Sequence, residues 1–418
     1  MPITYLVWFH SNIRSRRDTL LTVVLYIGPV NSQHLLVKDI YAPIGNGSSM
    51  VKNGVTREAD CGSRRRFLTT AGAVGVTAIV GCIGGSNDGG GNNQTDGTNS
   101  SSGSGLLSAE VTVTHWPLLM YAPPYQTAME NSYFEEEGIN LTNLVGSSGG
   151  GTTVRNVVTG GLPFGEVATP AAVNAFYAGA PLSIIASATN TPGTINWVTP
   201  KGSKFKSITD LKGQTVGYTS AGSVTQNTSA LAVRRADGIK VSDVEFQAMG
   251  GVSEGLTALK EGSIAAAANL DPVFSQQQQG EERWTVTYWA RDYIQKFQQT
   301  CVIAGPDILE NNPEAVRGYL RARARGVEFI RNNPDRAAEI FASYNDGYET
   351  QTMRDAIENV EPESYYTMNQ FSAEGLRLIA TGMKNIGLID RNIEWPKIID
   401  QSFLPESKRI DLGAVEQG

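Results

Sequence analysis

The stretch ITDLKGQTVGYTSAGSVTQNTSALAVRRADGIKVSDVEFQA, residues 208–248, sets a strand, a helix and a second strand in a row. A helical turn with an acidic N-cap at Asp210 and a glycine stop at Gly213 comes first. Residues 215–219 are predicted as a strand, which a short loop joins to a helix ending near residue 236. A second strand is predicted at 241–247. This alternation is typical of α/β layers.

The same alternation continues outward on both sides of this stretch. From Asn312 onward the pattern becomes mainly helical, and the pairs Asn312-Pro313 and Asn333-Pro334 open helices. We therefore expect an α/β fold of two lobes with a central ligand cleft and a helical C-terminal segment. The first lobe is expected to combine residues 109–192 with 300–418, and the second to span 193–299. The other expected strands are 111–114, 139–145, 164–168, 182–188, 196–199, 263–270 and 301–304, and the other helices are 125–136, 152–158, 170–177, 253–260 and 312–331.

Composition excludes several classes of protein. The chain has 418 residues, 40% of them hydrophobic, which is enough for two ordinary domains with real cores. It carries 34 Lys and Arg against 41 Asp and Glu, a net charge of −7. Residues 1–81 hold nine Lys and Arg against four Asp and Glu, so the remainder is more acidic still. Such a chain repels nucleic-acid backbones, and we expect no nucleic-acid partner.

Residues 50–82 have the order of an export signal. Arg64, Arg65 and Arg66 precede an apolar stretch at 71–80 and then Cys82. The arginines resemble a twin-arginine signal and the cysteine resembles the acylated residue of a lipobox, so we expect a lipid on Cys82. The alternative is a short membrane span, but about 14 apolar residues are too few to cross a bilayer.

Residues 1–49 precede this signal and residues 83–108 follow it, and we interpret the two segments differently. Residues 1–49 fit nothing in the scheme, so either translation starts at Met50 or they form a genuine extension. Residues 83–108 are mostly Gly, Ser, Asn and Thr, a composition typical of a flexible tether. The protein is then expected on the outer face of the cytoplasmic membrane, anchored through Cys82.

Three segments of the body, in order, resemble one family. Residues 208–218 (ITDLKGQTVGY), 256–266 (LTALKEGSIAA) and the two helix starts at 312–317 and 333–338 are similar to segments of binding proteins for nitrate, sulfonates, taurine and pyrimidine precursors. The likeness runs over about residues 110–350. It departs from the family at Ala265, where a carboxylate is usual, and at Asp271, where the family has a glutamate before proline.

The resemblance implies a type II periplasmic-type binding protein of an ABC importer. Such a protein captures a small solute between its lobes and delivers it to a membrane permease with ATPase subunits, and lobe closure is the working step. We expect a monomer without a cofactor. The family's usual cargo favours an anionic solute that resembles a sulfonate, nitrate or carboxylate.

Ligand contacts are expected in the loops that leave the strands, where open α/β sheets bind ligands. The loops 147–153 and 220–223 precede helices and suit an anion, although both can also be ordinary turns. Trp116 is expected either to stack on the solute or to pack in the core. Asp271 can bind a cationic group or cap a helix. The candidate residues are Trp116, Tyr121, Ser147, Ser148, Thr152, Thr153, Thr169, Asn190, Ser220, Gly222, Ser223 and Asp271.

Two other functions compete with transport. Pyrimidine synthases of similar fold rely on a histidine and a cysteine cluster, whereas this body holds only His115 and Cys301. Neither a metal-ligand spacing nor a nucleophile motif is present in the sequence, so we expect no enzyme activity and no metal. A sensor that keeps the fold without transport is the other rival. Arg321, Arg323 and Arg325 fall on one predicted helix and are expected to form a solvated face.

Overall fold

The computed structural model describes residues 7–15, 18–26, 35–43, 106–280 and 284–415, and the chain divides into two units, Met1–Asp96 and Gly97–Gly418. The first unit contains an antiparallel sheet in the order β1-β2-β3, formed by β1 (Val7–Ser15), β2 (Asp18–Tyr26) and β3 (Leu35–Pro43). The export signal expected at 50–82, its Cys82, and the tether up to residue 105 lie outside the described residues.

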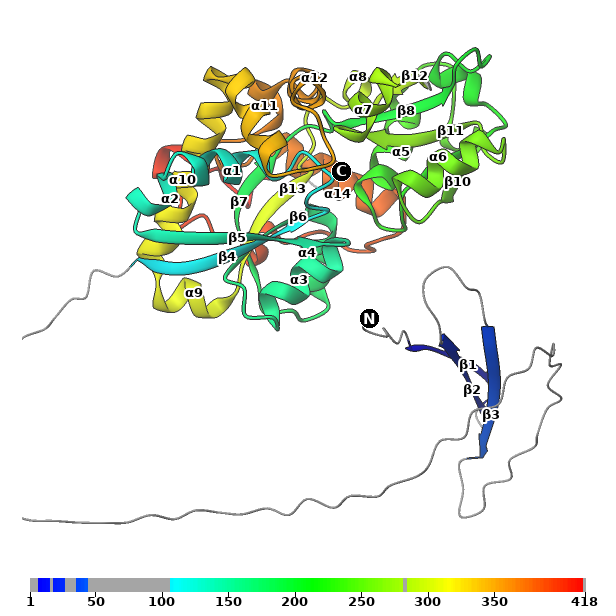
Figure 1. Cartoon of the computed structure of the whole chain (residues 1–418), viewed down its shortest axis with the longest axis horizontal. Coiled ribbons are helices and arrows are strands. Elements are labelled where there is room, and N and C mark those ends of the chain that lie inside the picture. Colours follow the sequence, from blue (N-terminus) through cyan, green and yellow to red (C-terminus); the bar gives the residue numbers. More distant parts are fainter. Residues whose placement is uncertain (1–6, 16–17, 27–34, 44–105, 281–283, 416–418) are drawn as a thin grey trace, which may run out of the picture. The chain divides into compact units, whose positions relative to one another are not determined.

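The second unit begins with a five-stranded sheet in the order β5-β4-β6-β13-β7 (Figure 1). β4 runs parallel to β5 and β6, while β13 is antiparallel to β6 and β7. We call this sheet with its helices the first lobe. Its strands are β4 (Leu107–Thr114), β5 (Ile139–Ser147), β6 (Phe164–Ala168), β7 (Ser183–Thr189) and β13 (Thr300–Ala304), and its helices are α1 (Pro123–Glu130), α2 (Tyr133–Glu136), α3 (Gly150–Val158), α4 (Thr169–Tyr177) and α9 (Pro306–Asn311).

A second five-stranded sheet has the order β10-β9-β11-β8-β12 and forms the second lobe. β9 runs parallel to β10 and β11, and β8 is antiparallel to β11 and β12. The elements are β8 (Ile195–Pro200), η1 (Ile208–Leu211), β9 (Thr215–Tyr218), α5 (Val224–Arg235), η2 (Val241–Asp243), β10 (Glu245–Ala248), α6 (Val252–Lys260), β11 (Ala266–Leu270), α7 (Val273–Gln279), β12 (Trp284–Trp289) and α8 (Ala290–Tyr293).

Trp197 of β8 is a fully buried aromatic residue of the second lobe. Its ring stacks on that of Tyr288, with centroids 4.8 Å apart, and its Nε1 donates to the carbonyl of Gly217 at 3.2 Å. The indole is fully buried, and this hydrogen bond satisfies its one polar atom. The side chain of β8 is therefore fixed against β9 and β12 at the centre of the sheet.

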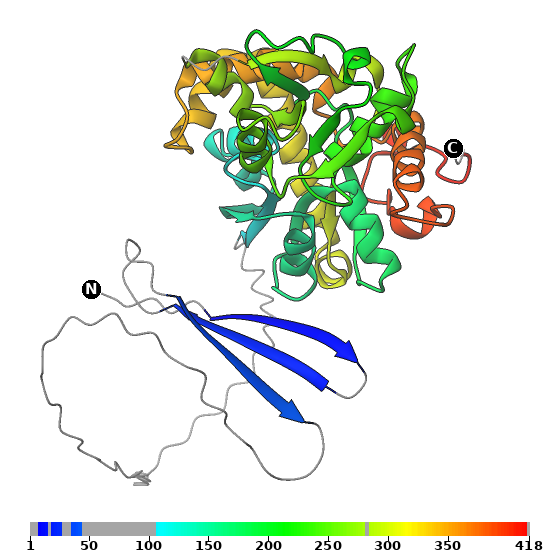
Figure 2. The ribbon, with the colours of Figure 1, turned by 90° about the vertical axis from the view of Figure 1, so that its right-hand side faces the viewer.

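The C-terminal segment contacts both lobes. α12 packs on α7 and α14 packs on α5, both in the second lobe, while α10 packs on α1 of the first. Figure 1 shows α12 and α14 between the two sheets, and Figure 2 shows the orange and red helices beside both groups of elements. The segment comprises α10 (Pro313–Asn332), α11 (Pro334–Ser343), α12 (Thr350–Val360), α13 (Pro362–Tyr365), α14 (Ala373–Asn385), α15 (Trp395–Ile398) and η3 (Glu406–Lys408).

The α/β prediction and the helical C-terminal segment are confirmed, but several local predictions are wrong. Ser207, not Asp210, is the N-cap of η1, and Asp210 completes a capping box as its third residue. The strand expected at 241–247 is the turn η2 followed by β10. The helix expected at 125–136 is two helices, because Ser132 adopts a left-handed φ of 56° between them. β4 begins at Leu107, inside the segment assigned to the tether.

One charged side chain was also misplaced by the prediction. Arg321 and Arg325 of α10 are partly exposed and pair with Glu137 and Glu136. Arg323 is fully buried, so the three arginines do not form one solvated face. Residues two apart on a helix lie on different faces, which sends Arg323 into the core between its neighbours.

Over residues 106–280 and 284–415, none of the helices combines the length and the apolar character that crossing a membrane requires.

Candidate ligand-binding site

The two lobes are joined at the carboxyl edges of their sheets. In the first lobe, β7 ends at Thr189 and β13 starts at Thr300, which pairs with both Thr189 and Ala168. In the second lobe, β8 starts at Ile195 opposite Leu270, the last residue of β11. Both connections between lobes, 189–195 and 294–300, therefore leave and enter at the edges where open α/β sheets bind ligands.

A set of buried polar groups without hydrogen-bond partners lies at this edge. It includes side-chain atoms of Thr169, Asn190, Thr194, Asp271, Gln298, Gln299 and Tyr365. Buried polar atoms are almost always hydrogen-bonded in proteins, so such a concentration needs an explanation. A bound solute or ordered water that supplies the missing partners is the ordinary one.

The backbone ties these side chains into one place. Thr169 N donates to the carbonyl of Gln299 at 3.0 Å, and the Gln299 amide donates to the Tyr121 hydroxyl at 2.8 Å. Asp271 N donates to the carbonyl of Thr194 at 3.2 Å. Asn190 N, on the connection that also contains Thr194, donates to the carbonyl of Tyr365 at 3.0 Å. We name the residues Tyr121, Thr169, Thr194, Asp271, Gln299 and Tyr365 the junction cluster.

Asp271 is the ionisable group of this cluster in the second lobe. Its side chain is buried, and Oδ1 accepts from the Ser275 backbone at 3.1 Å and from the Ser275 hydroxyl at 2.6 Å. Oδ2 has no partner among the described residues. Burial raises the pKa of Asp271 to about 7, against the hydrogen bonds from Ser275 and the charge of Arg291. Half of this carboxyl group is thus left to accept a hydrogen bond from another molecule.

Tyr348, between α11 and α12, links the two lobes beside Asp271. Burial, followed by the nearby charge of Asp271, raises the pKa of Tyr348 to about 12. The same hydroxyl donates to the carbonyl of Leu118 at 3.4 Å, in the loop after β4. The carbonyl of the adjacent Gly347 accepts from Gln276 of α7 at 2.8 Å, so this segment contacts both lobes.

Beneath the cluster, the first lobe contains a hydrogen-bonded core of charged groups. Glu166, in the middle of β6, accepts from the Tyr125 hydroxyl at 2.7 Å and from Thr300 at 3.0 Å. Arg323 donates from Nη2 to the carbonyl of Ala188 and from Nη1 to that of Thr367, both at 3.1 Å. Burial raises the pKa of Glu166, and the charge of Arg323 opposes the shift. These groups are fully occupied with one another and serve to position the strand ends.

The predicted site residues of the first lobe divide into two sets. Tyr121, Thr169 and Asn190 are at the junction. Ser147 and Thr153 are instead linked hydroxyl to hydroxyl at 2.6 Å, and Thr153 is linked in the same way to Thr114. This chain of hydroxyl groups holds α3 against β4 and β5. Ser148 is exposed and lies 3.4 Å from Thr152 between hydroxyl oxygens.

Trp116 packs against the protein. Its half-buried ring stacks on Phe341 of α11, with centroids 6.2 Å apart. This contact agrees with the core alternative for Trp116.

The backbone N–H groups of the loop 220–223 donate to acceptors within the loop and in the first turn of α5. Gly222 N donates to Gln226 Oε1 at 2.7 Å, Ser223 N donates to the carbonyl of Ser220 at 3.1 Å, and Ser223 Oγ caps α5 through Gln226 N at 3.2 Å. These bonds satisfy donors that an anion would otherwise use. The loop is therefore less suited to binding an anion than its sequence indicates.

Sequence reasoning missed Thr194, Gln299 and Tyr365. All three lie outside the strand-to-helix loops, on the two connections between lobes and at the end of α13. The run Gln298-Gln299-Thr300 at the start of a buried strand was the available signal, since long amides next to an apolar strand need partners.

In the described part of the chain, His, Cys, Asp and Glu side chains form no group of three or more that could hold a metal ion. Two surface cavities, of about 360 and 310 Å³, are lined by other residues than those of the junction cluster.

Comparisons with known proteins agree with this architecture. The model of the family described as "NMT1/THI5 like" matches residues 120–337. A formylaminopyrimidine-binding protein of Halalkalibacterium halodurans is 25% identical over 272 residues, which cover 63% of this chain and 77% of that protein.

Solved structures show the same fold. The periplasmic aliphatic sulphonate binding protein of Escherichia coli matches with a TM-score of 0.60 and 18% identity, over 73% of this chain and 95% of that one. The periplasmic nitrate-binding protein of Synechocystis matches with a TM-score of 0.56 and 13% identity, over 71% and 87%. The periplasmic-binding-protein fold expected from the sequence is confirmed. Since the family model covers more than half of the residues, this chain belongs to the NMT1/THI5 like family.

Proposed function

We propose that this chain is the solute-binding component of an ABC importer, which captures a small molecule between its two lobes and delivers it to a membrane permease and its ATPase. The observation that carries the proposal is the junction cluster. It draws unpartnered buried polar atoms from both lobes to the edge where the sheets meet. A solute bound there would complete hydrogen bonds to both lobes at once, which is how ligand binding favours a closed form.

The chemistry of the cluster favours a solute that donates hydrogen bonds. Asp271 Oδ2 is a buried acceptor without a partner, and the hydroxyls of Thr169, Thr194 and Tyr365 add groups that can donate or accept. The rings of Tyr121 and Tyr365 are buried there as well. A small heterocycle that bears N–H groups, such as an aminopyrimidine, suits this set. The name of the Halalkalibacterium relative supports the same class.

The oxyanion expected from the sequence is the second candidate. Residues 147–149 and 220–223 do precede the helices α3 and α5, whose N-termini attract negative charge. Against it, the carboxyl group of Asp271 would face a bound oxyanion unless it is protonated. The two candidates therefore differ in the sign of the effect that removing the Asp271 charge should have on binding.

Calorimetric titration of the chain with 4-aminopyrimidines, nitrate, an alkanesulfonate and a carboxylate separates these candidates. We expect an aminopyrimidine to bind and to raise the melting temperature by mass action. Asp271→Asn should weaken binding at least tenfold, because the amide presents one acceptor instead of two. Asp346→Asn, at an exposed position, is the matched control. Binding of nitrate or sulfonate that Asp271→Asn strengthens, without binding of an aminopyrimidine, would establish the oxyanion instead.

We also propose the export route and the anchor. The support is the order of Arg64, Arg65, the apolar stretch and Cys82 in the sequence. Cys82→Ser should release the exported protein from the membrane fraction, and Arg64→Lys with Arg65→Lys should block export. A Cys82→Ser protein that stays with the membrane would contradict the anchor.

Three narrower assignments belong to the same proposal. The lobes are residues 109–192 with 300–418, and 193–299; the protein acts as a monomer; and it binds its solute without chemical change. A sensor without transport remains the rival function. Loss of solute uptake in a strain that lacks this chain would support the importer, whereas intact uptake would favour the sensor.

A further inference from the structure

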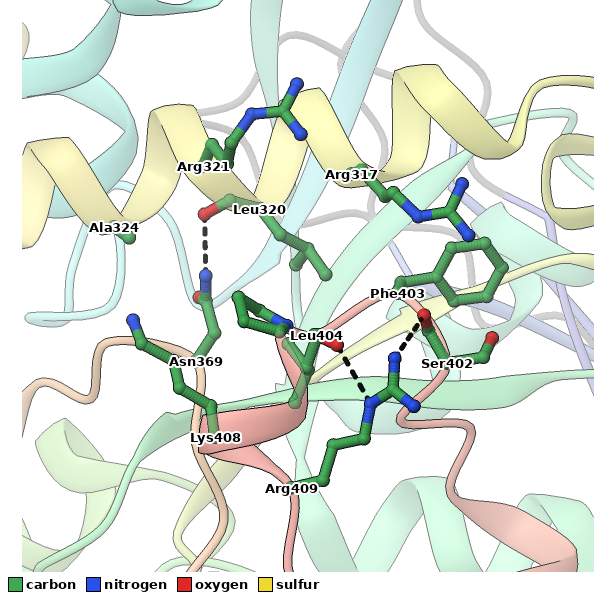
Figure 3. Close-up of a pocket in the computed structure, with 11 residues that line it drawn as sticks. Arg317, Leu320, Arg321, Ala324, Asn369, Ser402, Phe403, Leu404, Lys408 and Arg409 are labelled. Atoms are coloured by element: carbon green, nitrogen blue, oxygen red, sulfur yellow. Dashed lines mark hydrogen bonds between the residues drawn. The ribbon is translucent and has the colours of Figure 1, made fainter.

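A cavity of about 360 Å³ lies on the first lobe between α10 and the segment 402–409 (Figure 3). α10 contributes Arg317, Leu320, Arg321 and Ala324, whose spacing of three and four residues places them on one face of the helix. Figure 3 shows this face opposite Phe403, Leu404, Lys408 and Arg409. The cavity shares no residue with the junction cluster, so it is separate from the proposed solute site.

Positive charge is concentrated around this cavity. Arg409 donates from Nε to the carbonyl of Leu404 at 2.9 Å and from Nη2 to that of Ser402 at 3.1 Å, and Lys408 donates to the carbonyl of Met368 at 3.1 Å. Within 106–280 and 284–415, neither cation has an ion pair with a carboxylate. The residues that line the cavity include no acidic side chain. In a chain of net charge −7, two such cations beside a hollow are suited to an anion.

The other two arginines that line the cavity are already paired. Arg321 binds Glu137 at 2.7 Å, and its guanidinium points away from the segment 402–409 in Figure 3. Arg317 binds Glu314 at 2.7 Å and lies over the ring of Phe403, 5.5 Å from its centroid. The unneutralised charge is therefore at Arg409 and Lys408. A guanidinium with a planar set of donors is the group that best recognises an oxyanion.

Apolar side chains form the rest of the wall. Leu320, Ala324, Phe403, Leu404 and Pro405 line the same space. Their position beside the two cations matches a molecule with a charged head and a short hydrocarbon part. The volume is within the usual range of small-molecule sites, roughly 300–1,000 Å³.

We propose that this cavity is a second binding site, for a small organic anion whose oxyanion head meets Arg409 and Lys408 and whose hydrocarbon part lies on Phe403 and Leu404. Asn369 connects the site to the interior of the lobe. It lines the cavity, and its Oδ1 accepts from the buried Arg323 at 3.1 Å. A molecule bound in the cavity would therefore contact Asn369, which is hydrogen-bonded to Arg323 of the buried pair with Glu166.

Calorimetric titration of the full chain with butanesulfonate tests the site, with sulfate and butanol as single-feature probes. We expect saturable binding of butanesulfonate that is at least tenfold tighter than that of either probe. Arg409→Gln should weaken it at least tenfold, while Arg409→Lys keeps part of the affinity. Ala324→Leu fills the cavity and leaves the contacts of Arg409 intact, so it should also abolish binding. Arg336→Gln, on the exposed face of α11, is the matched control.

The effect of Asp271→Asn separates this site from the proposed solute site, because that variant should leave butanesulfonate binding unchanged. Three results would overturn the assignment. Butanesulfonate binding could be lost in Asp271→Asn, it could persist in both Arg409→Gln and Ala324→Leu, or sulfate could bind with equal affinity.

Anionic lipids carry similar head groups, so co-sedimentation of the chain with phosphatidylglycerol vesicles is measured alongside. If the chain sediments with the vesicles and Arg409→Gln abolishes this, the oxyanion head belongs to a lipid. If the chain binds butanesulfonate but does not sediment with the vesicles, the head belongs to a free anion. Failure to bind both butanesulfonate and the phosphatidylglycerol vesicles would refute the site.

Discussion

The carboxylate of Glu166 and the guanidinium of Arg323 are both fully buried and lie 3.6 Å apart, between Oε2 and Nη2. One belongs to β6 and the other to α10, more than 150 residues further along the chain. Thr300 of β13, Ala188 of β7 and Tyr125 of α1 are hydrogen-bonded to the pair. A buried pair of this kind contributes little more to stability than well-packed apolar residues of the same volume would. Losing one partner, however, leaves the other charge buried and uncompensated.

Arg323→Met should therefore be strongly destabilising. We expect the free energy of unfolding to fall by about 3–5 kcal/mol, because Glu166 loses its countercharge at a fully buried position. Arg321→Met, which breaks a partly exposed pair with Glu137, should cost less than about 1 kcal/mol. Denaturant unfolding at neutral pH measures both. Equal losses in the two variants would show that the buried pair has no special role.

The pKa of Asp271 predicts a pH dependence with a definite sign. The folded value is about 7 and the ordinary value is 3.8, so the folded state holds a proton that the unfolded state has lost. The contribution of this group to stability is complete below pH 3.8 and falls as the pH rises towards 7. Asp271→Asn removes this loss. Relative to the wild type, the variant should gain about 3 kcal/mol between pH 4.5 and 7.5 in denaturant unfolding.

Asp210→Asn is the control for that experiment. The hydrogen bond from the Lys206 backbone, followed by that from Ser207, lowers the pKa of Asp210 below 3.8. Asp210 is therefore ionised at both pH 4.5 and pH 7.5, and the difference between this variant and the wild type should be the same at the two values. An unchanged difference for Asp271→Asn as well would contradict the assignment of the proton to Asp271.

The sequence predicted the layers well because strands and helices in this fold are short and separated by turn residues. β6 at Phe164–Ala168 matches its prediction at both ends, since Pro163 and Thr169 bound a wholly apolar run apart from one glutamate. The charge of Glu166 could not be interpreted in the same way. Its partner Arg323 belongs to a distant helix, and periodicity within one element carries no information about such a pair.

The candidate site shows the same limit. Tyr121, Thr169, Asn190 and Asp271 each follow a strand or its adjoining loop, so the rule about strand ends found them. Thr194, Gln299 and Tyr365 reach the junction on the connections between lobes and on the C-terminal segment. Their position depends on how the two sheets meet, which is set by tertiary packing and has no local pattern.

Gly382 is where α14 of the C-terminal segment approaches α5 of the second lobe. A Cβ there would lie 2.7 Å from Asn227 Oδ1 and 3.1 Å from Leu231 Cδ1. Asn227 is held by a hydrogen bond to the Ser223 carbonyl at 2.9 Å, so it cannot easily move aside. Gly382→Ala should cost about 1–3 kcal/mol in thermal or denaturant unfolding through overpacking.

A glycine in an open position supplies the matched control. A Cβ on Gly151, in the first turn of α3, would meet no atom within 4 Å. Gly151→Ala should be neutral or stabilising by up to about 1 kcal/mol, because alanine favours the helix. If Gly382→Ala also stabilises the protein, the contact between α14 and α5 is looser than the structure shows.

Cys301 should be chemically inert in the folded protein. It lies in β13 with its side chain fully buried, its Sγ donates to the carbonyl of Val167 at 3.7 Å, and burial raises the pKa of its thiol to about 12. The thiolate, which is the reactive form, is then present in about one molecule in 10⁴ at pH 8.

With Cys61 and Cys82 replaced by serine, a thiol reagent should label the native chain at least 1,000-fold more slowly than the chain in denaturant. Rapid labelling of the native form would reveal an accessible nucleophile and would favour an enzyme over a binding protein. Slow labelling that follows the unfolding equilibrium would leave His115 without a cysteine partner for catalysis, since Cys301 is the one cysteine among the described residues.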